Sequence, residues 1–355
     1  MGADKQEYYR KNRIKTIGTV VLLIITAIIG IYSISVTQYH ISFSKALEII
    51  SNHLNHVEPA NYTEWLEDRI VCEKLVPRAI GGIAVGAILG ICGTIMQSTI
   101  RNPLADPYTT GISSGALLGV TLFTIFGFSI IPVKDTDLGL IITAFAFALI
   151  PCAIILGLSI FKTITSNTMI LIGIAVMYIF NAVSTLFRYT ATDEDVATIY
   201  SWAVGSLGML DWTSAFILVA VFGLIFAFGF FYAKKINILS ADDRLCRSLG
   251  INPSKSRILC LILVAIATAT AVCFVGTIGF VGLVAPHIAR IFVGSDNRYL
   301  IPASAVVGGC ILIAADTYAR VATFTGLPVG VITSLIGGPI FLLILLRQRK
   351  NTWGS

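Results

Sequence analysis

Residues 97–116 hold the densest group of side chains that can do more than pack in apolar surroundings. The segment contains two prolines that break a helix and two side chains that can hydrogen-bond the backbone groups exposed by the break, namely Pro103, Pro107, Asn102 and Asp106. The small residues that follow, over 111–116, permit close approach of helices. As a bare pattern, this is more typical of a structural re-entry of the chain than of a ligand site.

The histidines are weaker candidates for chemistry. His53 and His56 lie near Glu58 and could hold a metal ion, but no complete ligand set accompanies them. His287 follows Pro286 at an expected turn, where a hydrogen bond to the backbone is favoured over contact with a substrate. We therefore expect no metal site.

Asp316 is the only carboxylate well inside an apolar stretch. Intramembrane acids are commonly functional, but Arg320 lies one helical turn further on and favours a structural ion pair. The sequence has no phosphate-binding loop, catalytic triad or dinucleotide-binding fingerprint. We expect a chain that is not an enzyme, binds no cofactor and does not itself hydrolyse ATP.

The composition indicates the kind of protein framework that must position these residues. Of the 355 residues, 56% are hydrophobic and only 12% are charged, against about 25% charged in a soluble domain. The seven cysteines are scattered and form no CxxC pair. The net charge of +6 would suggest nucleic acid in a soluble protein, but here we expect lipid as the surroundings and no nucleic acid.

The apolar stretches predict the membrane crossings. Uncharged runs of roughly the length that spans a bilayer occur at 16–36, 79–97, 109–133, 138–161, 168–187, 213–233, 299–315 and 321–346. A further run, 258–289, holds glycines and Pro286 that favour a turn and a short second helix, so splitting it gives ten spans.

Charge asymmetry supports ten crossings. Basic residues at both ends of the chain indicate two cytoplasmic termini, which require an even number of spans. Ten spans leave 18 of the 25 Lys and Arg residues inside and 7 outside. We expect an all-α polytopic protein of the cell (plasma or inner) membrane, with one transmembrane domain over 1–355 and a cytoplasmic N-terminus over 1–15.

Two hydrophilic segments interrupt the spans. Residues 37–78 form the expected outer loop, in which four apolar residues recur at helical spacing and predict an amphipathic surface helix, namely Phe43, Leu47, Ile50 and Leu54. In the cytoplasmic loop 234–257, Ser240 is expected to cap a short helix that ends at Gly250. The apolar face of this helix is typical of a docking helix for a cytoplasmic partner. The alternative interpretation is that the segment is a solvated linker.

A short internal echo suggests a repeat. Gly93-Thr94-Ile95 precedes Pro103 at the same distance as Gly276-Thr277-Ile278 precedes Pro286. The two copies begin on helices of opposite direction, as in the inverted repeats of transporters. We expect helices 2–5 and 7–10 to be related in this way.

Four motifs occur together in residues 75–347. They are residues 101–107 with 111–116, Pro77-Arg78, residues 278–290, and residues 315–320 with 327–330. In this order they resemble the FecCD family, the permeases of type II ABC importers for iron siderophores, haem and cobalamin. The resemblance implies a ten-helix homodimer around one path, two cytoplasmic ATPases that hold ATP and Mg²⁺, and an extracytoplasmic binding protein.

The resemblance also implies roles for particular residues. The coupling loop would contact the ATPase through Asp242, Arg244, Arg247, Ser248, Leu249 and Gly250. Binding-protein docking would use three outward basic residues, namely Lys74, Arg78 and Arg320. Lys74 lies next to a position where the family often has an arginine. Alternatively, Arg78 and Arg320 only mark the membrane interface. Structural roles would fall to Asn102, Pro103, Asp106, Pro107, Pro286, His287 and Asp316.

The span 168–187 resembles the helix that lines the family's central path. Four residues along it are candidates for that lining, namely Gly173, Met177, Tyr178 and Asn181, and the preceding Thr165, Ser166 and Asn167 are candidates for an inner gate. Side chains of these types at helical spacing are also common packing residues.

The function implied is translocation of a chelate into the cytoplasm by alternating access. The alternative is an ion-coupled secondary transporter, which would need intramembrane carboxylates or histidines as carriers. Asp316 is almost alone in that respect.

Overall fold

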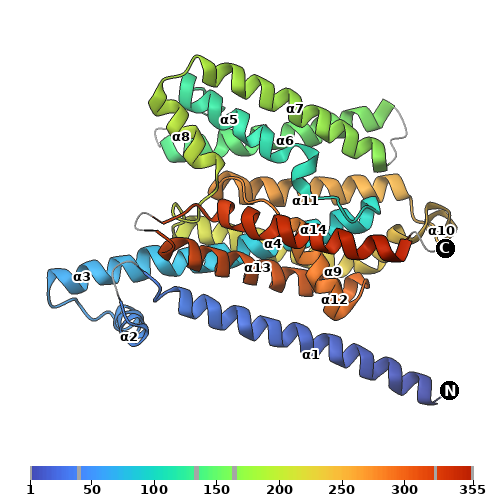
Figure 1. The fold of residues 1–355 in the computed structure, drawn as a ribbon, viewed down its shortest axis with the longest axis horizontal. Helices are drawn as coiled ribbons and strands as arrows, with labels where there is room; N and C mark the ends of the chain where they lie inside the picture. The colour runs from blue at the N-terminus through green and yellow to red at the C-terminus, as the bar shows by residue number, and fades with distance from the viewer. Residues whose placement is uncertain (1, 38–40, 132–135, 162–165, 324–325, 353–355) are drawn as a thin grey trace.

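The computed structural model is helical throughout the residues that it describes, which are 2–37, 41–131, 136–161, 166–323 and 326–352 (Figure 1). Its helices are α1 (Gly2–Ser33), α2 (Phe43–Leu54), α3 (Tyr62–Asp68), α4 (Val76–Ile100), α5 (Ile112–Phe126), α6 (Thr136–Phe161), α7 (Ser166–Tyr189), α8 (Asp193–Ala203), α9 (Trp212–Ala241), α10 (Asp243–Ser248), α11 (Pro253–Val275), α12 (Val281–Val293), α13 (Asn297–Val321) and α14 (Val329–Thr352). A π-helical segment, η1 (Arg69–Leu75), joins α3 to α4, and a 3-10 turn, η2 (Pro107–Thr110), precedes α5.

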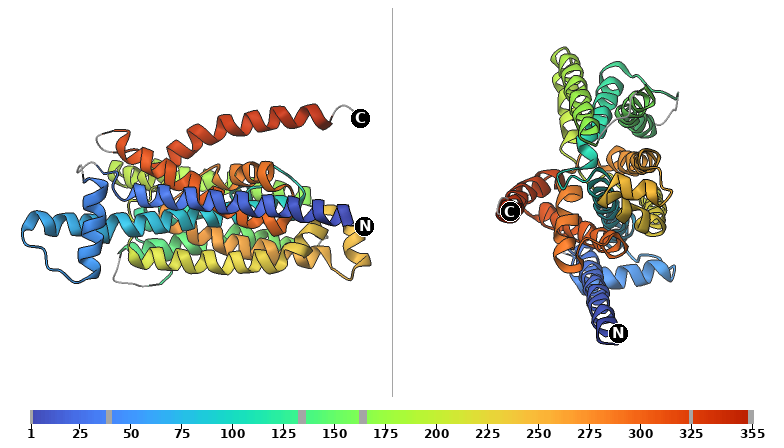
Figure 2. Two further views of the ribbon diagram at one scale, coloured as in Figure 1. Left: turned by 90° about the horizontal axis from the view of Figure 1, so that it is seen from below. Right: turned by 90° about the vertical axis from the view of Figure 1, so that its right-hand side faces the viewer.

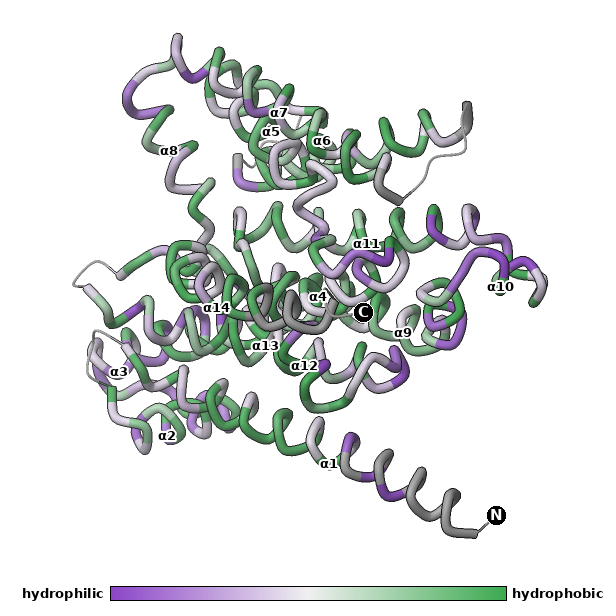
Figure 3. The backbone as a smooth tube through the Cα atoms, turned by 45° about the vertical axis from the view of Figure 1, so that its right-hand side comes forward, coloured by the Kyte–Doolittle hydropathy of each residue, from purple (hydrophilic) through white to green (hydrophobic). Residues whose placement is uncertain are grey.

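The long helices are apolar enough to cross a membrane. Among the described residues, seven qualify by length and composition; they lie in α1, in the run from α3 to α4, and in α6, α7, α9, α11 and α13. Three shorter apolar helices are α5, α12 and Val329–Leu343 of α14. Hydrophilic residues gather around α10 and near α2 and α3, at the two ends of the bundle (Figure 3). The chain is an all-α, multi-pass membrane protein.

Helix α4 lies at the centre and packs against α9, α11, α12 and α13. Glycines permit this contact, because a Cβ at Gly86 would lie 2.3 Å from the Gly308 carbonyl oxygen and one at Gly93 would lie 1.8 Å from that of Gly282. Close approach through small residues is the main way that membrane helices pack.

Helices α5, α6 and α7 form a second group beside α11 (Figure 1), and α1 packs along α13 and α12. The right-hand view of Figure 2 shows α1 and the second group on opposite sides of the central helices. The start of α1, the end of α14 and α10 lie at one end of the bundle, while α2 and α3 project from the other (Figures 1 and 2).

The structure agrees with several local predictions. Helix α2 occupies the amphipathic segment expected in the outer loop, and its Ser42 caps it by accepting from the Lys45 amide. The run 258–289 is broken as expected, because α11 ends at Gly276 and α12 begins after Phe280, both with positive φ (72° and 67°).

Two local predictions are wrong. Ser240 does not cap α10; it lies in the last turn of α9, its hydroxyl donates to the Asn237 carbonyl, and Asp242 occupies the N-cap position. Pro286 and His287 lie inside α12 rather than at a turn, because the glycines upstream already make the break. The two copies of the sequence echo lie on different local structures, since Gly93 lies within α4 and Gly276 caps α11, and the expected repeat stays a prediction.

Candidate functional site

Helix α10 presents apolar side chains to water at one end of the bundle. Leu245 and Leu249 are 45% and 57% exposed, whereas Cys246 is buried against the end of α9. Gly250, with a φ of 73°, ends the helix, and the Ile251 amide returns to the Cys246 carbonyl. The sequence-predicted residues Asp242, Arg244, Arg247 and Ser248 lie on this same short element.

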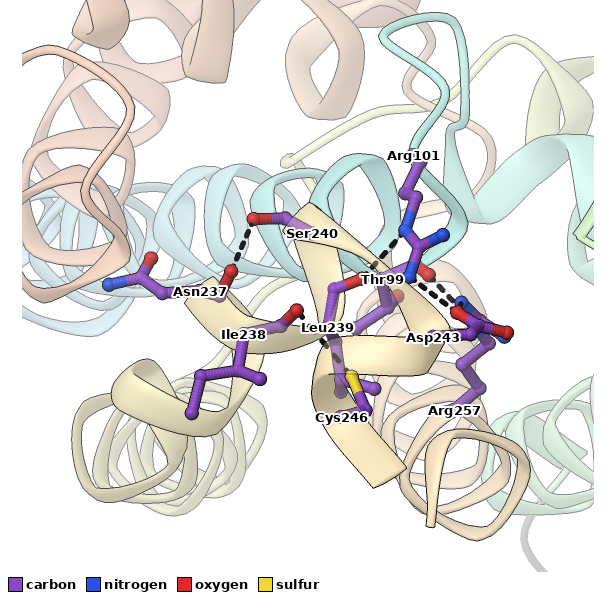
Figure 4. Close-up of polar contacts among 9 residues, drawn as sticks. All are labelled: Thr99, Arg101, Asn237, Ile238, Leu239, Ser240, Asp243, Cys246 and Arg257. Atoms are coloured by element: carbon purple, nitrogen blue, oxygen red, sulfur yellow. Dashed lines mark hydrogen bonds and ion pairs between the residues drawn. The ribbon is translucent and has the colours of Figure 1, made fainter. Parts of the chain in front are cut away.

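Asp243, the first residue of α10, joins α10 to two other elements (Figure 4). Arg257, from the first turns of α11, donates to both carboxylate oxygens at 2.6 and 3.1 Å. Arg101 donates to the same carboxylate from the end of α4. Hydrogen bonds from Arg257 lower the pKa of Asp243, so that the carboxylate is charged at neutral pH.

Both arginines also bind backbone. Arg101 sits at the C-cap of α4 with a φ of 57°, and its Nε donates to the Leu239 carbonyl of α9 at 2.7 Å. The Nε of Arg257 donates to the Thr99 carbonyl of α4 at 3.0 Å. Asp243, Arg101 and Arg257, which we call the Asp243 cluster, thus tie α10 to α4, α9 and α11 (Figure 4).

The loop after Arg101 continues directly into a buried motif. Asn102 accepts from the Leu104 amide at 2.9 Å, as expected for a side chain that stabilises a chain break. Asp106 is buried, and one of its oxygens, Oδ1, has no hydrogen-bond partner among the described residues. A Cβ at Gly282 would lie 2.7 Å from that oxygen, so the loop packs tightly on the start of α12.

This loop forms one wall of a cavity of about 900 Å³ that is open rather than enclosed. The other walls come from the end of α8, the break before α12 and α14; the lining is mostly apolar and consists of Leu104, Asp106, Tyr108, Thr109, Ser113, Ala203, Val204, Thr277, Gly279, Phe280, Leu283, Gly330, Val331, Ser334, Leu335 and Phe341. The Tyr108 hydroxyl accepts from the Ile278 amide at 3.3 Å and joins two of these walls.

A buried ion triad lies in the other half of the bundle. Asp316 of α13 is fully buried and receives a bidentate contact from Arg78 of α4, with Nη2 at 2.7 Å and Nε at 3.0 Å. The Nε of Arg320 lies 3.2 Å from the same carboxylate. The side chains of Arg78 and Arg320 are 20% and 11% exposed, while Lys74 is exposed. Pairing of Asp316 with Arg320 was expected; the bond to Arg78 was not.

None of the predicted path residues that the structure describes lines the cavity. Gly173 packs on η2, where a Cβ would lie 2.6 Å from the Thr109 carbonyl oxygen. Met177, Tyr178 and Asn181 lie along α7 and are not among the residues that line the cavity. Thr165 lies outside the described residues, as do the side chains of Ser166 and Asn167.

Sequence reasoning missed the role of Arg257 and gave Arg101 none of its own. Arg101 entered only as the first residue of the 101–107 motif, and Arg257 only as the last residue of the cytoplasmic loop 234–257. His287 bonds the backbone as expected, with Nδ1 2.8 Å from the Leu283 carbonyl oxygen.

A multi-pass helical bundle with an apolar cavity and a small amphipathic helix at one end defines a membrane transport protein. The FecCD transport family matches residues 23–347, and the chain belongs to this family. It is the permease subunit of an ABC importer and not a catalytic component.

Relatives and a solved structure agree with this placement. The hemin transport system permease protein of Yersinia pestis is 35% identical over 94% of this chain and 96% of its own length. The cobalamin import system permease protein of Halobacterium salinarum is 39% identical over 78% of this chain and 72% of its own. A metal-chelate type ABC transporter solved in an inward-facing conformation has a TM-score of 0.79 at 28% identity, covering 93% of this chain and 98% of that one.

Proposed function

We propose that this permease translocates a metal chelate of the haem, iron-siderophore or cobalamin class, and that α10 transmits the movement of cytoplasmic ATPases to the cavity. One observation carries the proposal: hydrogen bonds run without a gap from α10 through the Asp243 cluster to the start of the loop that lines the cavity. A volume of about 900 Å³ and a mostly apolar lining fit a large chelate held weakly.

The topology that we propose has ten crossings with both termini in the cytoplasm. Seven long and three shorter apolar helices support that number. Each proposed repeat then has a short second helix, 15 residues in α5 and 13 in α12, which supports an inverted repeat of α4–α7 and α11–α14. The open cavity would be completed by a second copy of the chain in a homodimer.

The proposed cytoplasmic contact is made by Leu245 of α10 and Leu249 at its C-cap, because nothing in the part of the chain that the structure describes shields these two leucines. Arg244, Arg247, Ser248 and Gly250 would surround this contact, with Asp242 at its start. Two ATPases would bind there and would hold ATP and Mg²⁺ themselves. Asp243 remains available to anchor the helix from behind.

On the opposite end, an extracytoplasmic binding protein would dock near Lys74. Its exposure makes it the most accessible of the three predicted docking residues. Arg78 and Arg320 would contribute positive potential, while the Nε and Nη2 of Arg78 and the Nε of Arg320 contact Asp316. The triad also argues against the alternative of an ion-coupled carrier, because both carboxylate oxygens of Asp316 are already occupied by arginine side chains.

Replacement of Leu249 tests the cytoplasmic contact. Leu249→Glu should abolish co-purification of the ATPase with the permease, because it places a charge where an apolar contact is expected. Lys255→Glu is the matched control: it adds a carboxylate at an exposed position a few residues away and should leave the complex intact. Retention of the ATPase by the Leu249 variant would refute the assignment of α10.

A further inference from the structure

Three side chains with different metal-binding atoms meet where α2 contacts η1. The His53 Nδ1 lies 3.0 and 3.1 Å from the two carboxylate oxygens of Asp68. These groups and the Cys72 sulfur all lie within 4.8 Å of one another. The fold brings them together because Asp68 and Cys72 are four residues apart on one helical face and the last turn of α2 crosses that face.

An ordinary hydrogen bond accounts for only part of this arrangement. It explains the contact of His53 with Asp68, but it does not explain why a thiol adjoins both groups. Packing would account for Cys72 alone, since it is buried beside Ala46, Val71 and Leu75. Among the described residues, this is the one place where three His, Cys, Asp or Glu side chains converge closely enough to share an ion.

We propose that His53, Asp68 and Cys72 bind a divalent cation of the zinc class. Imidazole, thiolate and carboxylate are the donors that zinc takes, at about 2.0–2.3 Å. In a tetrahedral site the ligand atoms are then roughly 3.5 Å apart, so a closure of about 1 Å completes the site. The nitrogen and sulfur donors favour such an ion over Mg²⁺ or Ca²⁺, which prefer oxygen.

The surroundings favour a cation. A cavity of about 200 Å³ beside the cluster is lined by several carboxylates, namely Glu48, Glu58, Glu64, Glu67 and Asp68. Lys45 is the one lysine in that lining, and it is paired with Glu67 at 2.6 Å. The remaining acids leave a negative field at the entrance, which raises the local concentration of cations. Water can fill the fourth position of the ion.

A bound ion would fasten α2 to the segment that leads into Lys74 and Arg78. Two polar contacts, the Lys45–Glu67 ion pair and the His53–Asp68 hydrogen bond, already hold α2 against α3 at this end of the bundle. The ion would replace the second contact with coordinate bonds and would add a link to η1. Binding of the ion does not depend on the identity of the transported substrate.

Cobalt is the probe that distinguishes this site from adventitious binding. The full chain, purified in detergent and freed of metal, should bind one Co²⁺ with a thiolate charge-transfer absorption, and Zn²⁺ should displace it. Cys72→Ser should remove that absorption, because only the thiolate produces it. Unchanged absorption in this variant would overturn the proposal.

Affinity for Zn²⁺ gives a second readout on variants that cannot disturb the core. His53→Gln alters a side chain that is half exposed and should weaken binding by roughly tenfold or more. His56→Gln, three residues on and outside the cluster, is the matched control and should bind as the parent does. Equal affinity of the His53 variant and the parent would contradict the proposal, as would equal losses in both variants.

Discussion

The Asp243 carboxylate accepts hydrogen bonds from arginines that enter from the ends of two different helices (Figure 4). Because Arg101 also opens the loop that lines the cavity, displacement of α10 must move that loop or break the cluster. The sequence does not show that Arg101 and Asp243 pair, because 142 positions separate them. Their types are visible there, but their partnership depends on the bundle.

Replacement of Arg257 should uncouple the permease without releasing the ATPase. Arg257→Ala removes two hydrogen bonds to Asp243 and one to the Thr99 carbonyl. Each charge-assisted bond contributes about 1.5–3 kcal/mol, so we expect ATP-driven uptake to fall roughly tenfold or more. Lys255→Ala is the control in the same segment, and equal uptake by both variants would contradict the role of the cluster.

Substitutions within the buried triad should have coupled effects on the free energy of unfolding. Asp316→Asn leaves two arginines without their carboxylate in the interior, which should lower the free energy of unfolding by about 3–5 kcal/mol. Adding Arg78→Gln should recover part of that loss, because it removes an unpaired charge. Thermal unfolding in detergent measures both effects, and strictly additive losses would show that the residues act independently.

At the scale of elements, the glycines of α4 determine how closely the central helices approach. The sequence predicted that α4 spans the membrane and contains small residues. It did not predict which neighbouring helix each small residue faces, because a helix that is apolar all round has no polar face to orient it. The break before α12 was predicted from its glycines. The helical continuation of α3 through η1 into α4 was not, because residues 62–75 are polar enough to suggest a loop.

Two glycine-to-alanine changes should have opposite effects. Gly86→Ala places a methyl group 2.3 Å from the Gly308 carbonyl oxygen and 2.8 Å from the Gly309 Cα, so it should destabilise the bundle by about 1–3 kcal/mol. Gly223→Ala in α9 meets no atom within 4 Å and should stabilise it by about 0.5–1 kcal/mol. Thermal unfolding of the two variants tests this, and a neutral Gly86 variant would contradict the close packing of α4 on α13.

For the whole molecule, composition and motif order were sufficient to predict a multi-pass permease, because both depend on the sequence alone. The cavity could not be predicted, since its walls come from loop 101–111, α8, the break before α12 and α14, which are far apart in the chain. Arg78 and Arg320 show the same difficulty: the sequence predicted the pairing of Asp316 with Arg320, but the bond of Arg78 to the same carboxylate depends on the fold.

Transport by this chain is expected to need both an ATPase on one side of the membrane and a binding protein on the other. Uptake of a haem, ferric siderophore or cobalamin into proteoliposomes tests this requirement. We expect uptake with ATP only when the permease, ATPase and binding protein are all present. Uptake by this chain alone, driven by an ion gradient, would contradict this expectation.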